Sequence, residues 1–106
     1  MKVKIKDYEY EIIECDKTDS DIYNSGEVKY YGRTFYMSQV IKIYKYLSPI
    51  RKRQTLIHEL THAFLDVYLA GQSLTGKYNE EDVCCFMGTY SEDILRIVNE
   101  YFNKEV

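Results

Sequence analysis

The sequence lacks tryptophan, contains one proline and has no apolar run longer than a few residues. A transmembrane helix needs about 20 predominantly apolar residues, so no segment qualifies. Residues 1–10 alternate lysines with apolar side chains, so they lack the continuous apolar segment of a signal peptide. We therefore predict a cytoplasmic protein that does not bind membranes.

Cysteine is scarce as well. The three cysteines are Cys15, Cys84 and Cys85, an odd number with two of them adjacent, and this pattern does not make a disulfide framework. Thiols that stay reduced are typical of intracellular proteins, in which free cysteine is commonly a buried residue. We expect these cysteines to contribute packing rather than chemistry.

Positive charge is not in excess. The 14 lysines and arginines stand against 17 aspartates and glutamates, which gives a net charge of -3. A dedicated nucleic-acid-binding protein normally carries a basic face, so a nucleic-acid partner is not expected. The local exception is the basic run Arg51-Lys52-Arg53. With 106 residues, 45% hydrophobic and 29% charged, the chain has the balance of one globular domain spanning residues 1–106.

The first half of the chain predicts β-strands. Apolar and polar residues alternate with a period of two at several places, separated by turn-forming residues. The candidate strands are Val3–Ile5, Tyr8–Ile12, Glu27–Tyr31, Arg33–Met37 and Val40–Tyr44, with turns near Lys6–Asp7 and Ser38–Gln39 and a loop over Asp16–Gly26. Together these segments predict a small, mostly antiparallel sheet.

The second half predicts two helices. Ser48-Pro49 is a helix start, because serine caps free amides and proline suits the first helical position. Apolar residues then recur at helical spacing, and Gly71 is the expected stop. After a polar loop over residues 72–78, Asn79 can cap a second helix that continues to near the C-terminus. Gly88 permits a kink in the middle of that helix.

Residues 58–62 read His-Glu-Leu-Thr-His, an H-E-x-x-H pattern inside the first predicted helix. Residues four apart lie on one helix face, so His58 and His62 can bind one metal ion. Glu59 projects beside them, where it can take a proton from water. Two imidazoles, an oxygen ligand and an open position make up a catalytic zinc site. We therefore predict an α+β fold whose sheet packs on the H-E-x-x-H helix, with the C-terminal helix closing a zinc site.

The third zinc ligand must come from elsewhere, because the sequence contains only these two histidines. A carboxylate is expected, and the second helix opens with Asn79-Glu80-Glu81-Asp82. Glu80 lies three residues before Val83, on the face expected to point inwards, so Glu80 is the preferred ligand. Glu81 and Asp66 are the alternatives, although Asp66 could instead accept a hydrogen bond from a metal-bound histidine and so orient its ring.

The run Thr55–Phe64, preceded by Leu47-Ser48-Pro49, resembles the first motif of the ImmA/IrrE type of small zinc metallopeptidase. It is most similar to the compact versions found in phages and other mobile elements of Gram-positive bacteria. Asn79–Val83 resembles the second motif of that family, in which the first glutamate is the zinc ligand; this supports Glu80. The small residue and asparagine that usually follow the glutamate are Val83 and Cys84 here.

The resemblance implies a zinc-dependent peptide-bond hydrolase whose partner is a protein or peptide substrate, in this family a repressor. Glu59 would move a proton from water to the leaving amine. Tyr68, Tyr78 and Tyr90 are candidates for stabilising the oxyanion, although packing explains each of them better. The alternative function is a zinc-binding interaction module, in which the basic run docks an acidic partner. The presence of Glu59 favours the enzyme.

Overall fold

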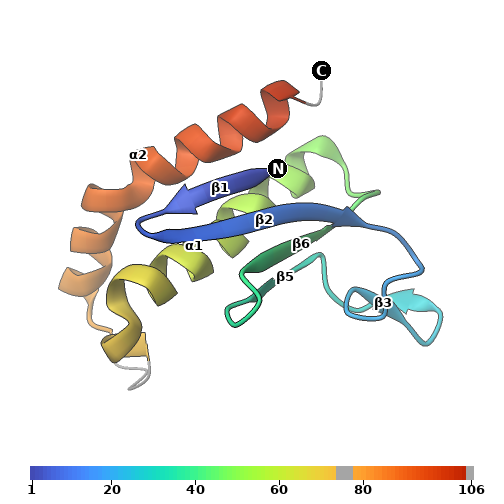
Figure 1. Cartoon of the computed structure of the whole chain (residues 1–106), viewed down its shortest axis with the longest axis horizontal. Helices are drawn as coiled ribbons and strands as arrows, with labels where there is room; N and C mark the ends of the chain where they lie inside the picture. Colours follow the sequence, from blue (N-terminus) through green and yellow to red (C-terminus); the bar gives the residue numbers. More distant parts are fainter. Residues whose placement is uncertain (74–77, 105–106) are drawn as a thin grey trace.

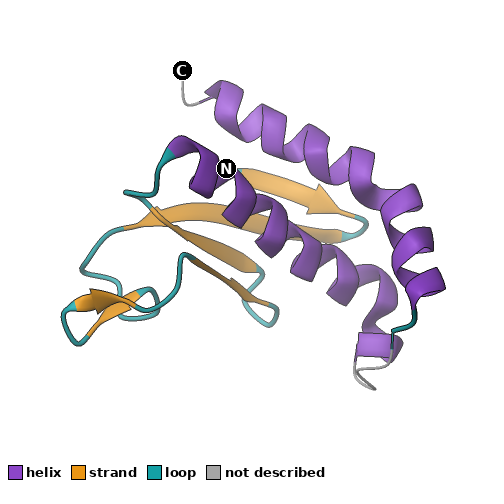
Figure 2. Ribbon diagram, turned by 180° about the vertical axis from the view of Figure 1, so that it is seen from behind, coloured by secondary structure: helices purple, strands orange, loops and turns teal. Residues whose placement is uncertain are grey.

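The computed structural model describes residues 1–73 and 78–104 and shows an α+β fold, as predicted. The elements follow in the order β1 (Lys2–Ile5), β2 (Tyr8–Cys15), β3 (Tyr23–Asn24), β4 (Glu27–Val28), β5 (Gly32–Phe35), β6 (Val40–Tyr44), α1 (Pro49–Ser73) and α2 (Glu80–Lys104). Helix α1 lies across one face of the main sheet and α2 packs beside α1 (Figures 1 and 2).

The main sheet has four strands in the order β1-β2-β6-β5. The β1–β2 and β5–β6 pairs are antiparallel, while β2 and β6 are parallel, with Ile12 opposite Ile41. The prediction of a mostly antiparallel sheet is therefore confirmed. Strands β3 and β4 form a separate two-stranded ribbon. This order makes β5 an edge strand, on the side of the sheet that α1 contacts most.

The predicted strand boundaries are correct at β6 and wrong around β4 and β5. The strand expected over residues 27–31 stops at Val28, because the amides of Lys29 and Tyr30 both bond to the carbonyl of Ile22. The next strand begins at Gly32, which was expected to separate two strands but pairs with Ile43 instead. A glycine therefore lies inside the edge strand.

The core lies between the sheet and the two helices. Alternate side chains of the strands are buried there, and α1 contributes one continuous apolar face. The buried members include Val3, Ile5, Tyr10, Ile12, Ile41, Ile43, Leu56, Leu60, Ala63, Phe64, Phe86, Ile94, Ile97, Val98 and Tyr101. Full burial of a leucine or isoleucine side chain is worth about 1.5–3 kcal/mol. This face fixes the rotation of α1 and leaves His58 and His62 exposed to solvent.

The helix starts agree with the prediction. The Ser48 hydroxyl accepts the amide of Arg51 at 3.3 Å. The Asn79 side chain accepts the amide of Asp82 at 2.8 Å, and the Asp82 carboxylate accepts the amide of Asn79 at 3.2 Å. This reciprocal pair is a capping box that satisfies two otherwise unpaired amides at the start of α2.

The helix ends and interiors differ from the prediction in two places. Helix α1 continues past Gly71 to Ser73, and its backbone leaves helical values at Leu69, with φ -128° and ψ 32°. Helix α2 runs without a kink through Gly88. Most of the loop predicted over residues 72–78 lies outside the described residues. No helix in the described part of the chain is both long and apolar enough to span a bilayer.

Candidate metal centre and catalytic site

His58 and His62 lie one turn apart on the exposed face of α1. Their Nε2 atoms are 3.2 Å apart, and their ring centroids are 4.9 Å apart. Two nitrogen ligands at ordinary Zn–N distances in a tetrahedral site lie about 3.3 Å from each other. The two imidazoles therefore already have the separation that a shared zinc ion requires, and solvent reaches both.

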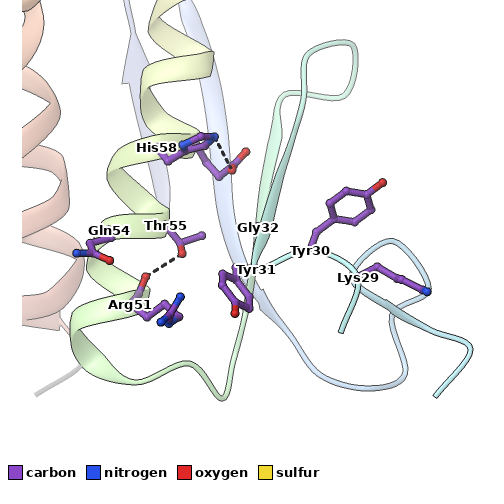
Figure 3. Close-up of a pocket in the computed structure, with 9 residues that line it drawn as sticks. Lys29, Tyr30, Tyr31, Gly32, Arg51, Gln54, Thr55 and His58 are labelled. Carbon is purple, nitrogen blue, oxygen red and sulfur yellow. Dashed lines mark hydrogen bonds and ion pairs between the residues drawn. The ribbon is translucent and has the colours of Figure 1, made fainter. Parts of the chain in front are cut away.

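Glu59 is only 6% exposed, in contrast to its two neighbouring histidines. Its Oε1 atom accepts a hydrogen bond from the Thr34 hydroxyl at 2.8 Å. Its Oε2 atom lies 3.9 Å from Nε2 of His58, and a dashed line marks this pair in Figure 3. A buried carboxylate requires such a partner, because burial without one is costly. One oxygen is thus held by strand β5 and the other faces the histidine pair.

Gly32 allows β5 to approach α1 closely enough for this arrangement. A Cβ atom at Gly32 would lie 2.8 Å from Thr55 Cγ2, 3.0 Å from Glu59 Cγ and 3.1 Å from Ile43 Cδ1. Contacts this short force a neighbouring group to move. The Glu59 side chain therefore occupies space that only a glycine leaves open.

The carboxylates at the start of α2 are not assembled with the histidines. The described residues contain no group of three His, Cys, Asp or Glu side chains placed to hold a metal ion. Glu80 is exposed and has no hydrogen bond or ion pair within the described chain. Glu81 lies 3.7 Å from the Cys85 thiol, and Asp82 belongs to the capping box.

The predicted inward face of α2 needs a correction at its first turn. Phe86 is buried, as expected, but Val83 is 53% exposed. Val83 lines a small surface pocket together with Thr61 and Leu65 of α1. The first turn of α2 therefore lies against the second half of the H-E-x-x-H motif and the turn after it, not against the sheet, and this leaves Val83 half open to solvent.

Asp66 is coupled to tyrosines of the sheet side. Burial first, and then the negative charge of Asp66, raise the pKa of Tyr10 on β2 to about 12. Burial, followed by the charges of Asp66 and Glu59, also raises the pKa of Tyr36. The Tyr36 phenol therefore lies in the field of Glu59, yet sequence reasoning had no means of selecting it among 12 tyrosines.

Two of the three tyrosines proposed from the sequence are packing residues. The rings of Tyr68 and Tyr90 stack at 4.3 Å, and Phe64 and Phe86 pack against Tyr90. Tyr78 lines the small pocket that contains Val83. Packing against aromatic neighbours therefore accounts for Tyr68 and Tyr90.

A pocket of about 400 Å³ opens beside His58 and Glu59 (Figure 3). Its lining comes from the segment leading into β5 and from the first three turns of α1. The residues are Lys29, Tyr30, Tyr31, Gly32, Arg51, Gln54, Thr55, His58 and Glu59. Strand and helix thus form the two walls, and the candidate site lies at one end.

The basic run at residues 51–53 does not form one patch. Lys52 pairs with Glu14 at 2.8 Å, and Arg53 donates to Asn99 Oδ1 at 2.9 Å. Only Arg51 faces the pocket. The observation that suggested a basic docking surface, and hence an interaction module, therefore loses its weight.

Paired imidazoles one turn apart, with an adjacent buried carboxylate, are typical of the H-E-x-x-H class of metallopeptidases. The chain matches the Peptidase_M78 family, described as the IrrE N-terminal-like domain, over residues 6–85, and it belongs to this family. The resemblance seen in the sequence is confirmed, and the function is of the metallopeptidase type. Comparisons with curated proteins and with solved structures find no significant match.

Proposed function

We propose that residues 1–106 act as a single zinc-dependent peptidase domain, in which His58, His62 and Glu80 bind the metal and Glu59 is the general base. The observation that carries this proposal is the 3.2 Å separation of the two Nε2 atoms, with the Glu59 carboxylate beside them. Membership in a peptidase family supports peptide-bond hydrolysis as the reaction.

Zinc, when bound, supplies Lewis-acid polarisation of the scissile carbonyl and lowers the pKa of water. Glu59 Oε2 takes the proton of the attacking water and passes it to the leaving amine. The Thr34 hydroxyl holds Oε1, which keeps the carboxylate from turning away. Proton transfer of this kind commonly contributes about 10²–10⁴ in rate. Tyr36 is proposed to donate a hydrogen bond to the developing oxyanion, because its phenol lies in the field of Glu59 and a tyrosine is protonated at neutral pH.

Glu80 is proposed as the third ligand because its neighbours are already engaged. Asp82 caps α2, and Glu81 lies against Cys85, whereas Glu80 has no partner within the described chain. The matched family region extends to residue 85 and includes Glu80. A carboxylate without a competing contact is free to turn towards a metal.

The edge strand supports a peptide as substrate. The outer side of β5 carries backbone amides and carbonyls with no strand partner in the described chain, and it lies next to Glu59. An extended peptide can add to such an edge through main-chain hydrogen bonds. A repressor protein encoded nearby is the first substrate to test, on the basis of the family resemblance.

The test compares Glu59→Gln with His62→Ala. We expect Glu59→Gln to keep one zinc per chain and a native circular dichroism spectrum while hydrolysis falls by about 10²–10⁴. His62→Ala should lose both zinc and hydrolysis. Equal cleavage rates in the parent and Glu59→Gln would remove Glu59 as the base. Stoichiometric zinc with no cleavage of any substrate would favour the interaction module instead.

A further inference from the structure

We infer that the pocket beside Glu59 is a specificity subsite for a carboxylate of the peptide substrate, with an aspartate or glutamate side chain as the occupant and Arg51 as its partner. This inference rests on the proposed peptidase function, since it names the class of peptide that the site accepts. The argument starts from the charges that line the pocket.

Arg51 is the one cation of the lining without an anionic partner in the described chain. Lys29 pairs with Glu27 at 2.7 Å, whereas no carboxylate of the described residues lies within ion-pair distance of the Arg51 guanidinium. The first turn of α1 contains no acidic residue. The positive end of the helix dipole therefore adds to the charge of Arg51.

Arg51 is exposed, and its guanidinium has one aromatic neighbour. It lies 5.2 Å from the centroid of the Tyr31 ring, and the two side chains approach one another across the pocket (Figure 3). Stacking on an aromatic ring leaves the edge of the guanidinium free to donate two parallel hydrogen bonds, which a carboxylate can accept. The Thr55 hydroxyl, beside it, donates to the Arg51 carbonyl and so helps to fix the helix turn below.

Arg51 and Glu59 lie at opposite ends of the pocket. Arg51 lies two helical turns before Glu59, a distance of about 12 Å along the axis. An acidic side chain bound at Arg51 thus stays clear of Glu59, while its backbone remains near the site. A basic side chain at the same end of the pocket would instead face the positive charge of Arg51.

The experiment measures binding separately from cleavage. Three alanine-based pentapeptides are titrated into the zinc-supplied protein, and the backbone amide resonances of Tyr31 and Thr55 are followed by NMR. The first peptide has a central glutamate and blocked ends. The second has a central glutamine and blocked ends, and the third has a central glutamine and a free C-terminal carboxylate. The variant Arg51→Gln is compared with Arg53→Gln, which removes a cation of the same helix that bonds Asn99 outside the pocket.

We expect the glutamate peptide to bind about tenfold more tightly than the blocked glutamine peptide. Arg51→Gln should abolish this preference and Arg53→Gln should retain it. Equal binding of these two peptides, or equal effects of the two variants, would overturn the inference. Tighter binding of the peptide with the free C-terminal carboxylate than of the glutamate peptide would also overturn it, because the subsite would then recognise the C-terminus of a peptide.

Cleavage of a peptide library by the parent protein tests the proposed function independently. Selective binding of the glutamate peptide with no library cleavage would leave the subsite standing and refute the peptidase. Cleavage without enrichment of acidic residues near the cut, in parent and Arg51→Gln alike, would keep the peptidase and refute the subsite. Both proposals together require acidic enrichment that disappears in Arg51→Gln and persists in Arg53→Gln.

Discussion

The two sides of the candidate metal centre differ in how far they are formed. On the side made by α1 and β5, the two imidazoles lie at ligand spacing and Glu59 is buried against Thr34 and Gly32. On the side made by α2, Glu80 is exposed and without a partner in the described chain.

The two sides differ because one depends on the geometry of a single helix and the other on how two helices are arranged. Helical geometry alone places residues four apart on one face, and the buried face of α1 fixes which way that face points. The position of Glu80 depends instead on how α2 follows α1, and the capping box fixes only the start of α2. The histidines are at ligand spacing, whereas the proposed role of Glu80 requires its carboxylate to move towards the metal.

The largest expected effect tests the unassembled side. Glu80→Gln should weaken zinc binding by at least about 10- to 100-fold, because it removes a charged ligand. Loss of a residue that only supports a ligand already costs about that much in metal affinity. Competition with a chromophoric chelator measures the affinity. Glu81→Gln is the matched control and should change it little. A larger loss in Glu81→Gln would mean that α2 presents the neighbouring carboxylate to the metal.

The next effect tests the assembled side through its packing. Gly32→Ala should lower the free energy of unfolding by about 1–3 kcal/mol and displace Glu59, because the added methyl group overlaps Thr55 and Glu59. Urea denaturation and hydrolysis rate report the two consequences.

Gly88→Ala provides the control for this change. A Cβ at Gly88 has nothing within 4 Å, and alanine is the better helix former by about 0.8–1.0 kcal/mol. The control should therefore be at least as stable as the parent and equally active. Unchanged stability in Gly32→Ala would show that β5 and α1 separate easily.

A smaller effect is expected from the hydrogen bond alone. Thr34→Val keeps the side-chain shape but removes the hydroxyl that holds Glu59 Oε1, so kcat should fall by about tenfold with zinc affinity unchanged. Thr34→Ser restores the hydroxyl and should recover most of the rate. If valine and serine variants are equally slow, the shape of the side chain matters and the hydrogen bond does not.

The smallest effect lies away from the site and tests whether these changes are local. Lys42 Nζ donates to Asp19 at 2.7 Å and to Asp21 at 2.9 Å. The first bond lowers the pKa of Asp19, and the two together raise the pKa of Lys42. The stabilisation from Asp19 is present above its unfolded pKa of about 3.9 and is lost as the pH falls through the lower folded pKa. The contribution of Lys42 is lost only as the pH rises beyond about 10.4.

Lys42→Met should therefore lower the free energy of unfolding by about 1 kcal/mol at pH 7, and the difference from the parent should shrink below about pH 4. Zinc affinity should not change. Lys4→Met removes a β1 cation without an ion pair in the described chain and should be close to neutral at both pH values. A pH-independent loss in Lys42→Met would point to packing as the cause.

The elements that the sequence predicted well are those set by short-range patterns. The cap at Ser48 and the spacing of His58 and His62 follow from residues within one or two turns. Thr34 is different, because it lies 25 residues before Glu59 and reaches it only through the pairing of β5 with β6. No local signal marks a threonine or a glycine in an edge strand as part of a site.

Two further details depended on tertiary packing. Helical spacing predicted Val83 as inward, but that rule cannot tell a sheet from the end of a neighbouring helix as the partner surface. Tyr36 is one of 12 tyrosines and is 45% exposed, so only its electrostatic coupling to Asp66 and Glu59 distinguishes it.

The packing of Glu59 against Gly32 affects how an inactive variant of this protein should be designed. Truncation to alanine would remove the carboxylate and also leave a void beside a residue that has no side chain of its own to fill it. Thr34 would lose its acceptor at the same time. An alanine variant would thus confuse lost chemistry with a loosened strand, whereas glutamine retains the volume and leaves an amide oxygen for Thr34. In this fold the proposed general base also fills the space between α1 and β5.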